Sequence, residues 1–227
     1  MTKLDANLSR IVQGVIECGI FHVDFENPTT YTNGMRGPPY ANFRDVQGYL
    51  QLRDLIVEAL VSKLAPRLRG MRGNCAIAGI QSGIIPISTL VADRLGLSHF
   101  SVRKEPKQHG INRSIDGGNP AGKICFLLDD VVNNGTSMPK ACKALEEAGA
   151  NVICCGSIFT YKKDLSVVGR TLPTTDIFSL LTRQDFQGAL IEAGILDEVG
   201  WDRLLAWRDN PEGWNADYVM GLRSSAD

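Results

Sequence analysis

Residues 124–151 read ICFLLDDVVNNGTSMPKACKALEEAGAN, and this stretch decides the fold. Its first part, Ile124–Leu128, is an apolar run of the kind found in a central parallel strand. Asp129 and Asp130 follow at the carboxyl end of that run. A polar loop comes next, and Ser137 is a good start signal for the helical pattern after it. The stretch therefore predicts a strand, a loop and a helix in succession.

The same alternation of strand and helix recurs along the chain. Cys75–Ile80 is typical of a buried strand and Ile85–Leu95 of the helix after it, while Phe100–Arg103 and Val152–Phe159 indicate further strands. Strands that alternate with helices predict an α/β fold with a mostly parallel central sheet flanked by helices. Ligands bind at the carboxyl ends of strands in such sheets, which is where the two adjacent aspartates are expected.

Composition limits the kinds of protein that this chain can be. Its 227 residues are 44% hydrophobic and 22% charged, which suits one enzyme-sized domain. A formal net charge of −1 provides no general attraction to nucleic acid or to a membrane, so neither is an expected partner. Six cysteines without CxxC spacing suit a reducing, cytoplasmic location. No stretch reaches membrane-spanning length, and no export signal is visible.

The loop at 133–137 has the features of a phosphate cradle. The backbone N–H groups of Asn134, Gly135, Thr136 and Ser137 precede or open a helix, and two of these residues add hydroxyls. The two aspartates would then serve another part of the ligand, as acceptors for vicinal sugar hydroxyls or as carboxylates that hold Mg²⁺ through water. A sugar phosphate is the ligand that fits both features.

A plainer interpretation is a hairpin at Asn134-Gly135 with solvated aspartates, but the helix that follows argues against a hairpin. The chain has no GxxxxGK[ST] sequence, and no GxGxxG follows a strand. A nucleoside triphosphatase and a dinucleotide enzyme are therefore not expected.

A second cluster of polar residues lies at 103–109. Four cationic or potentially cationic side chains fall within seven residues, and they are Arg103, Lys104, Lys107 and His109. Such a run is commonly a solvated surface loop. Beside the strand-end aspartates, closure over a diphosphate explains it better, because a leaving pyrophosphate needs charge neutralisation and exclusion of water.

These motifs carry a resemblance to a known family. LLDDVVNNGTS (127–137) resembles the phosphoribosyl pyrophosphate (PRPP) signature of the type I phosphoribosyltransferases, and VRKEPKQHG (102–110) resembles the catalytic loop of the orotate phosphoribosyltransferases. Four further segments resemble that family in order along the chain, namely NPTTYTNGMRGPPY (27–40), SGIIPISTLVADRLGL (82–97), IFTY (158–161) and LLAWRDNPEGW (204–214).

The resemblance implies transfer of phosphoribosyl from PRPP to orotate, with Mg²⁺ bound through pyrophosphate and water rather than directly by protein ligands. It implies one domain over residues 1–227, with an N-terminal hood at 1–45, a core at 46–165 and a C-terminal part at 166–227. It also implies a homodimer in which Arg103 and the lysines reach the neighbouring subunit's site.

The resemblance further assigns roles to individual residues. The catalytic residues it implies are Lys107, His109, Asp129 and Asp130. The PRPP-binding residues it implies are Ser82, Gly83, Arg103, Lys104, Asn133, Asn134, Gly135, Thr136 and Ser137. The candidates for contact with the base are Arg36, Tyr40, Asn133 and Tyr161.

The sequence departs from the family pattern mainly at residues that are expected to contact the base. Asn133 replaces a small hydroxyl residue, and Thr32 stands where many members carry a lysine. Tyr161-Lys162-Lys163 stands where other members have an arginine that binds the orotate carboxylate. Arg36, Lys162 or Lys163 would have to bind that carboxylate instead. Two alternatives stay open: a phosphoribosyltransferase for another base, and a regulator that senses PRPP without turnover.

Overall fold

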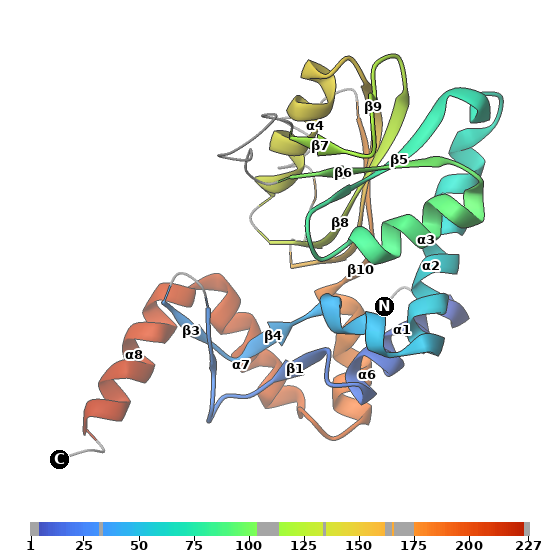
Figure 1. Ribbon diagram of the computed structural model, residues 1–227. Coiled ribbons are helices and arrows are strands. Elements are labelled where there is room, and N and C mark those ends of the chain that lie inside the picture. Colours follow the sequence, from blue (N-terminus) through green and yellow to red (C-terminus); the bar gives the residue numbers. More distant parts are fainter. Residues whose placement is uncertain are drawn as a thin grey trace. The chain divides into compact units, whose positions relative to one another are not determined.

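The computed structural model describes residues 5–31, 34–103, 114–133, 135–161, 165 and 175–224 (Figure 1). The chain divides into two compact units. The larger unit comprises Met1–Ile11 and Phe43–Gln184, and the smaller comprises Val12–Asn42 and Asp185–Asp227. The prediction of a single domain with a hood, a core and a C-terminal part stays a prediction.

A six-stranded sheet forms the centre of the larger unit. Its strands, in spatial order, are β10 (Asp176–Thr182), β9 (Asn151–Thr160), β8 (Ile124–Val132), β5 (Cys75–Ile80), β6 (Ser98–Val102) and β7 (Ile115–Asp116). Only the pairing of β6 with β7 is antiparallel among these described strands. The predicted α/β fold with a mostly parallel sheet flanked by helices is confirmed.

Helices cover both faces of this sheet (Figure 1). Side chains alternate between the faces along each strand. Ala76, Ala78 and Ile80 of β5 pack in one apolar cluster with α4 (Ser137–Glu147). On the opposite face, α3 (Ile85–Leu95) lies so close to Gly79 that a Cβ atom added there would meet Ser88 and Ile85. Helix α2 (Leu50–Leu64) packs against α3. Short 3₁₀ helices lie in the connections, at η1 (Phe43–Gly48), η2 (Ala65–Leu68) and η3 (Arg72–Asn74).

The structure of residues 124–151 differs from the prediction in two details. Strand β8 continues to Val132, so Asp129 and Asp130 lie within the strand instead of after it. Pairing with β9 explains the extension, because β9 continues to Thr160 and bonds with β8 along its whole length. Ser137 is the first residue of α4, and the N-cap is Thr136, whose side chain makes no capping hydrogen bond.

The smaller unit contains two short antiparallel ribbons and the C-terminal helices. Strand β1 (Phe21–Val23) pairs with β4 (Pro39–Ala41), and β2 (Thr29–Thr30) pairs with β3 (Arg36–Gly37). The helices are α6 (Gln187–Glu192), α7 (Glu198–Asp209) and α8 (Pro211–Ser224), preceded by the 3₁₀ helix η4 (Arg183–Phe186). The N-terminal helix α1 (Ala6–Glu17) buries Ile11, Val12 and Val15.

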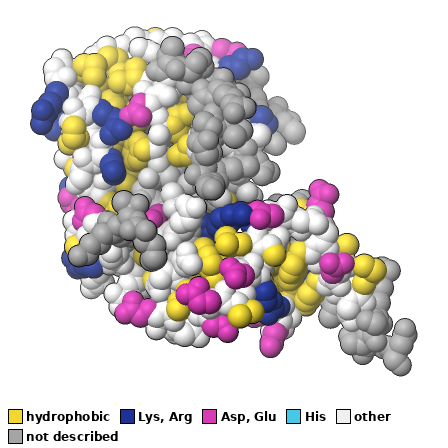
Figure 2. All heavy atoms as spheres, turned by 180° about the vertical axis from the view of Figure 1, so that it is seen from behind, with side chains coloured by type: hydrophobic (Ala, Val, Ile, Leu, Met, Phe, Trp, Pro, Cys, Tyr) yellow, Lys and Arg dark blue, Asp and Glu magenta, His cyan; other side chains and the backbone are white. Residues whose placement is uncertain are grey.

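Surface charge agrees with the near-neutral composition. Basic and acidic side chains are interspersed on the face drawn in Figure 2. Among the described residues, no helix has the length and apolar content that crossing a membrane requires. Among the described residues, no disulfide joins any of the six cysteines, and five of them are buried.

Candidate functional site

Two carboxylates are fixed near the carboxyl end of the central strand β8. Asp129 is almost fully buried, with 3% of its surface exposed, and its Oδ1 accepts the backbone N–H of Asp130 at 3.0 Å. Asp130 in turn accepts the N–H of Val131 at 3.0 Å and is partly exposed. A buried carboxylate is costly unless it is hydrogen-bonded, and these local bonds hold both acids in place.

The loop between β5 and α3 lies directly against this pair. Gly83 is buried, and a Cβ atom added there would overlap Asp130 Oδ2. The peptide bond between Gln81 and Ser82 is cis. Ser82 and Gly83, which the family resemblance assigns to pyrophosphate, are thus brought together with Asp130. Only glycine permits so close an approach of backbone to carboxylate.

A cation that the sequence analysis missed also lies here. Arg44 of η1 places its Nε 3.9 Å from Asp130 Oδ2, and its Cγ would lie 3.2 Å from a Cβ at Gly83. Its side chain is 57% exposed, against 16% for Asp130, so the pair itself contributes little to stability. No local sequence signal marks Arg44, because the contact joins distant parts of the chain.

The predicted phosphate loop connects β8 to α4. Gly135 has a φ of +75°, a conformation that favours glycine, and Asn133 and Thr136 are exposed. Ser137 opens the helix, so the free N–H groups of its first turn follow the loop directly. Asn134 lies outside the described residues. The described part of the loop fits an anion at the N-terminus of α4.

Tyr161 lies at the neighbouring strand end. Its backbone N–H donates to Val132 O at 3.1 Å, next to Asn133. Its ring meets the edge of Phe159 at a centroid distance of 4.8 Å, and Phe159 stacks on Phe43 at 5.4 Å. The structure therefore brings Tyr161 and Asn133, two candidates for contact with the base, to the same edge of the sheet.

Arg103 is held within its own chain at the end of β6. Its Nη2 donates to Asp116 Oδ2 at 2.5 Å, and Gln81 Nε2 donates to the same oxygen at 3.0 Å. Gln81 and Asp116 were not among the predicted site residues. Asp116 lies in a short strand that the composition of 104–122 does not indicate.

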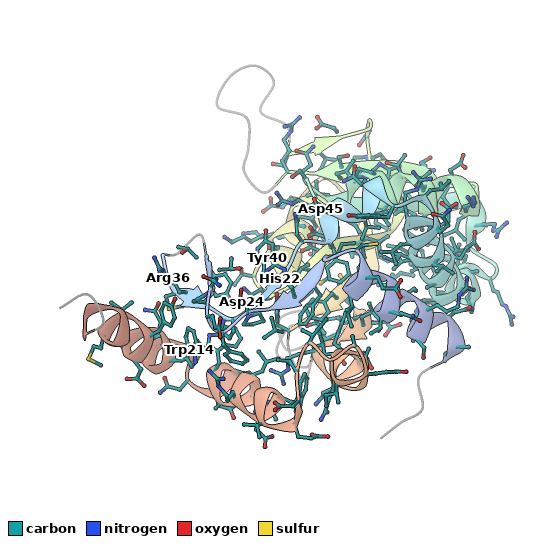
Figure 3. The ribbon with its side chains drawn as sticks, turned by 90° about the horizontal axis from the view of Figure 1, so that it is seen from below. His22, Asp24, Arg36, Tyr40, Asp45 and Trp214 are labelled. Carbon is teal, nitrogen blue, oxygen red and sulfur yellow. The ribbon has the colours of Figure 1, made fainter. Side chains whose placement is uncertain are left out.

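The other candidates for the base belong to the smaller unit. Arg36 lies on β3 and Tyr40 on β4, where the rings of Tyr40 and His22 are 5.5 Å apart (Figure 3). The N–H of Arg36 donates to Asn215 Oδ1 of α8 at 2.8 Å. The remaining predicted residues lie outside the described residues, and they are Lys104, Lys107, His109, Thr32, Lys162 and Lys163.

The site has few protein ligands to offer a metal ion. Among the described residues, no group of three or more His, Cys, Asp and Glu side chains could hold one. The adjacent carboxylates of Asp129 and Asp130 do fit Mg²⁺, which usually keeps several waters and binds one or two carboxylates together with substrate phosphates.

The imidazole of His99 lies near the start of β6, away from the strand ends that form the candidate site. His99 Nε2 lies 2.8 Å from Ser88 Oγ, and Ser88 is fully buried. Burial lowers the pKa of His99, since desolvation disfavours the charged imidazolium. The contact ties α3 to β6 and makes His99 a packing residue.

Comparison with known proteins identifies the family. A family model described as a phosphoribosyl transferase domain matches residues 49–197. The chain belongs to the phosphoribosyltransferase family. The orotate phosphoribosyltransferase of Levilactobacillus brevis is 31% identical over 90% of this chain and 96% of its own length. The resemblance to orotate phosphoribosyltransferases is thus confirmed.

Solved structures agree on the fold of this phosphoribosyltransferase. The orotate phosphoribosyltransferase of Aeropyrum pernix superposes with a TM-score of 0.67 at 20% identity, over 82% of this chain and 99% of that one. The adenine phosphoribosyltransferase of Saccharomyces cerevisiae reaches 0.59 at 19% identity, over 76% and 99%. The same fold therefore occurs in proteins named for different bases.

Proposed function

We propose that this phosphoribosyltransferase transfers the phosphoribosyl group of PRPP to orotate, giving orotidine 5′-monophosphate and pyrophosphate for pyrimidine nucleotide synthesis. The observation that carries the proposal is the meeting of three features at one strand end: the carboxylates of Asp129 and Asp130, the close backbone at Gly83, and the loop that opens α4. Orotate is chosen as the base because relatives of nearly full length are named for it.

The chemistry is a displacement at C1 of the ribose. Asp129 and Asp130 accept hydrogen bonds from the ribose hydroxyls, and their charge stabilises the positive ribosyl centre that develops as the bond to pyrophosphate breaks. The loop from Asn133 to Ser137 holds the 5′-phosphate, and Ser82 and Gly83 hold the pyrophosphate through backbone amides. A ring nitrogen of orotate forms the new bond to C1.

Mg²⁺ would be held by the pyrophosphate and water beside Asp129 and Asp130. When bound, it neutralises part of the charge of the leaving pyrophosphate. The basic residues Arg103, Lys104 and Lys107 complete that neutralisation, and His109 donates a proton to the departing group. Arg44 adds a positive charge beside Asp130 in the described part of the site.

Four residues are proposed for contact with the base. Asn133 and Tyr161 are the candidates of the larger unit, and Arg36 and Tyr40 are those of the smaller unit.

The proposed enzyme is a cytoplasmic homodimer. Six cysteines without a disulfide among the described residues support a reducing compartment. The family resemblance, in which Arg103 and the lysines reach the neighbouring subunit's site, supports the homodimer.

Turnover of a panel of bases with PRPP and Mg²⁺ tests the proposal. Orotate should be converted to its nucleotide, and the Asp129→Asn, Asp130→Asn double variant should lose turnover while its unfolding temperature stays near that of the wild type. Asp176→Asn, at the amino end of β10, is a matched control that should stay active. Use of another base supports the first alternative, and PRPP binding without any turnover supports a regulator.

A further inference from the structure

The carboxylate of Asp130 is held by contacts from three separate parts of the larger unit. Its Oδ1 accepts the N–H of Val131 at 3.0 Å, within β8 itself. Its Oδ2 lies so close to the backbone at Gly83 that a Cβ atom added there would overlap it. The Nε of Arg44 lies 3.9 Å from the same Oδ2. One oxygen is therefore fixed within the strand, and the other faces a loop and a cation.

Arg44 contributes its stem as well as its charge. Its Cγ would lie 3.2 Å from a Cβ at Gly83, and the three atoms nearest to that position all belong to Asp130 and Arg44. The backbone of η1 is anchored next to Arg44, because Phe43 is buried and stacks on Phe159 of β9 at 5.4 Å. A fixed backbone and a stem that lies over Gly83 thus bring the cation to Asp130.

The length of the contact between Arg44 and Asp130 decides what it can do. At 3.9 Å the Nε attracts Oδ2 but is too distant for a hydrogen bond, since N–H···O bonds measure about 2.7–3.2 Å. This arginine therefore leaves Oδ2 able to accept from a ribose hydroxyl. The Arg44 side chain is 57% exposed, so the pair contributes little to the stability of the fold. A cation at this distance orients the carboxylate without occupying it.

We infer that Arg44 is a positioning residue for the proposed reaction. Its charge and its stem keep the carboxylate of Asp130 between η1 and the backbone at Gly83, in the orientation that accepts the ribose hydroxyls. The inference rests on the proposed PRPP site and deepens it, because it names the group that orients one of the two aspartates. Arg44 acts through Asp130 and is not a ligand of pyrophosphate. It orients a carboxylate of its own chain, so this role needs no partner subunit.

Calorimetry on the full-length protein with Mg²⁺ separates the ribose side of the site from the pyrophosphate side. Arg44→Met keeps a stem of similar length and removes the charge. Ribose 5-phosphate should then bind about two- to fivefold more weakly, as expected for loss of an exposed ion pair, while inorganic pyrophosphate should bind as it does to the wild type. The unfolding temperature should not change.

Steady-state kinetics of the Arg44→Met variant provide a second measurement. Its kcat/KM for PRPP should fall about three- to tenfold, between the small effect of an exposed ion pair and the larger loss when a reacting group moves by about 1 Å. The KM for orotate should stay that of the wild type, because the base does not contact Asp130. A role in folding alone would not separate the two substrates in this way.

Two further variants show whether the effect is one of charge that acts on Asp130. Arg44→Lys should recover most of the loss, because a contact of 3.9 Å requires a positive charge and not the two-point fork of a guanidinium. In an Asp130→Asn background, Arg44→Met should cause no further weakening of ribose 5-phosphate binding, since the amide carries no charge to orient.

Arg94→Met is the matched control. Arg94 also pairs with a partly exposed carboxylate, that of Glu58 at 3.1 Å, but it lies in the last turn of α3, at the end of that helix away from Gly83. It should change neither binding nor turnover.

Four results would overturn the inference. Weaker pyrophosphate binding in Arg44→Met would make Arg44 a ligand of pyrophosphate. An unchanged kcat/KM, an Arg44→Lys variant as impaired as Arg44→Met, or an effect that persists in the Asp130→Asn background would show that Arg44 does not orient Asp130 through its charge. A wild-type chain that binds neither ribose 5-phosphate nor pyrophosphate would instead refute the proposed PRPP site.

Discussion

The carboxylate of Asp130 occupies the space that a side chain at Gly83 would need. The atom that a new methyl group would displace is the end of a side chain, which can rotate away, so the cost falls on the site more than on the fold. Because the packing is this close, the absence of a side chain at Gly83 determines where the carboxylate of Asp130 in β8 can lie.

Gly83→Ala should therefore lower kcat/KM for PRPP about 10- to 100-fold, the loss expected when a reacting group is displaced by about 1 Å. Its unfolding temperature should stay close to that of the wild type. Gly73→Ala is the control, since a Cβ there meets no atom within 4 Å. Steady-state kinetics and thermal unfolding measure both effects, and full activity of the Gly83→Ala variant would contradict the account.

His99 gives a second prediction at this scale, for the pH dependence of stability. Burial lowers the pKa of His99, so at low pH the unfolded chain binds more protons at this imidazole than the folded chain does. The free energy of unfolding therefore falls as the pH drops below about 6.5, the ordinary value for histidine.

His99→Gln should remove this component, so its unfolding temperature should decline less between about pH 7.5 and pH 5.5 than that of the wild type. Thermal unfolding across that range provides the measurement. His22→Gln, at an exposed position, should keep the wild-type decline. The same decline in the His99 variant would mean that other groups produce it.

At the scale of elements, helix α8 holds the ribbon that carries Arg36. Asn215 Oδ1 accepts the N–H of Arg36 at 2.8 Å, and Tyr218 OH donates to Glu26 O at 3.0 Å. The guanidinium of Arg36 lies 5.9 Å from the ring centre of Tyr218, which stacks on Trp214 (Figure 3). The C-terminal helix is thus part of the unit that presents a candidate base-binding residue.

Asn215→Ala should destabilise the protein by about 1 kcal/mol, the usual cost of losing one hydrogen bond that is partly buried. Denaturant unfolding measures the change. Asn7→Ala, on an exposed position of α1, corrects for the higher helix propensity of alanine and should not destabilise. Equal stability of the two variants would show that the contact between α8 and β3 contributes nothing.

At the scale of the whole molecule, the proposed dimer predicts recovery of activity between two inactive chains. One chain carries Asp129→Asn with Asp130→Asn, and the other carries Lys107→Ala with His109→Ala. In a mixed dimer with shared sites, one site combines intact aspartates with an intact basic segment. Random exchange makes half of the dimers mixed, so orotate turnover should return to about one quarter of the wild type.

The control for this experiment is each variant chain alone, which should stay inactive at the same total concentration. Native mass spectrometry confirms that mixed dimers form. If they form and no activity returns, Lys107 and His109 act within their own chain, and the shared site must be abandoned.

The sequence by itself determined the four central strands of the larger unit's sheet, β5, β6, β8 and β9, and the centre of the candidate site. Continuous apolar runs identified β5 and β8, because a central parallel strand is buried on both faces. Asp129, Asp130 and the loop at 133–137 were recognisable because a strand, a loop and a helix N-terminus follow one another in the chain.

Only the tertiary structure decided the contacts between distant segments. Arg44 beside Asp130, and Gln81 with Arg103 on Asp116, join residues that no local period relates. Strand β10 and the helices after it were not predicted, since short amphipathic segments depend on their neighbours for stability. The extension of β8 to Val132 has the same cause, because a strand ends where its hydrogen-bonding partner ends, and that partner is supplied by another part of the chain.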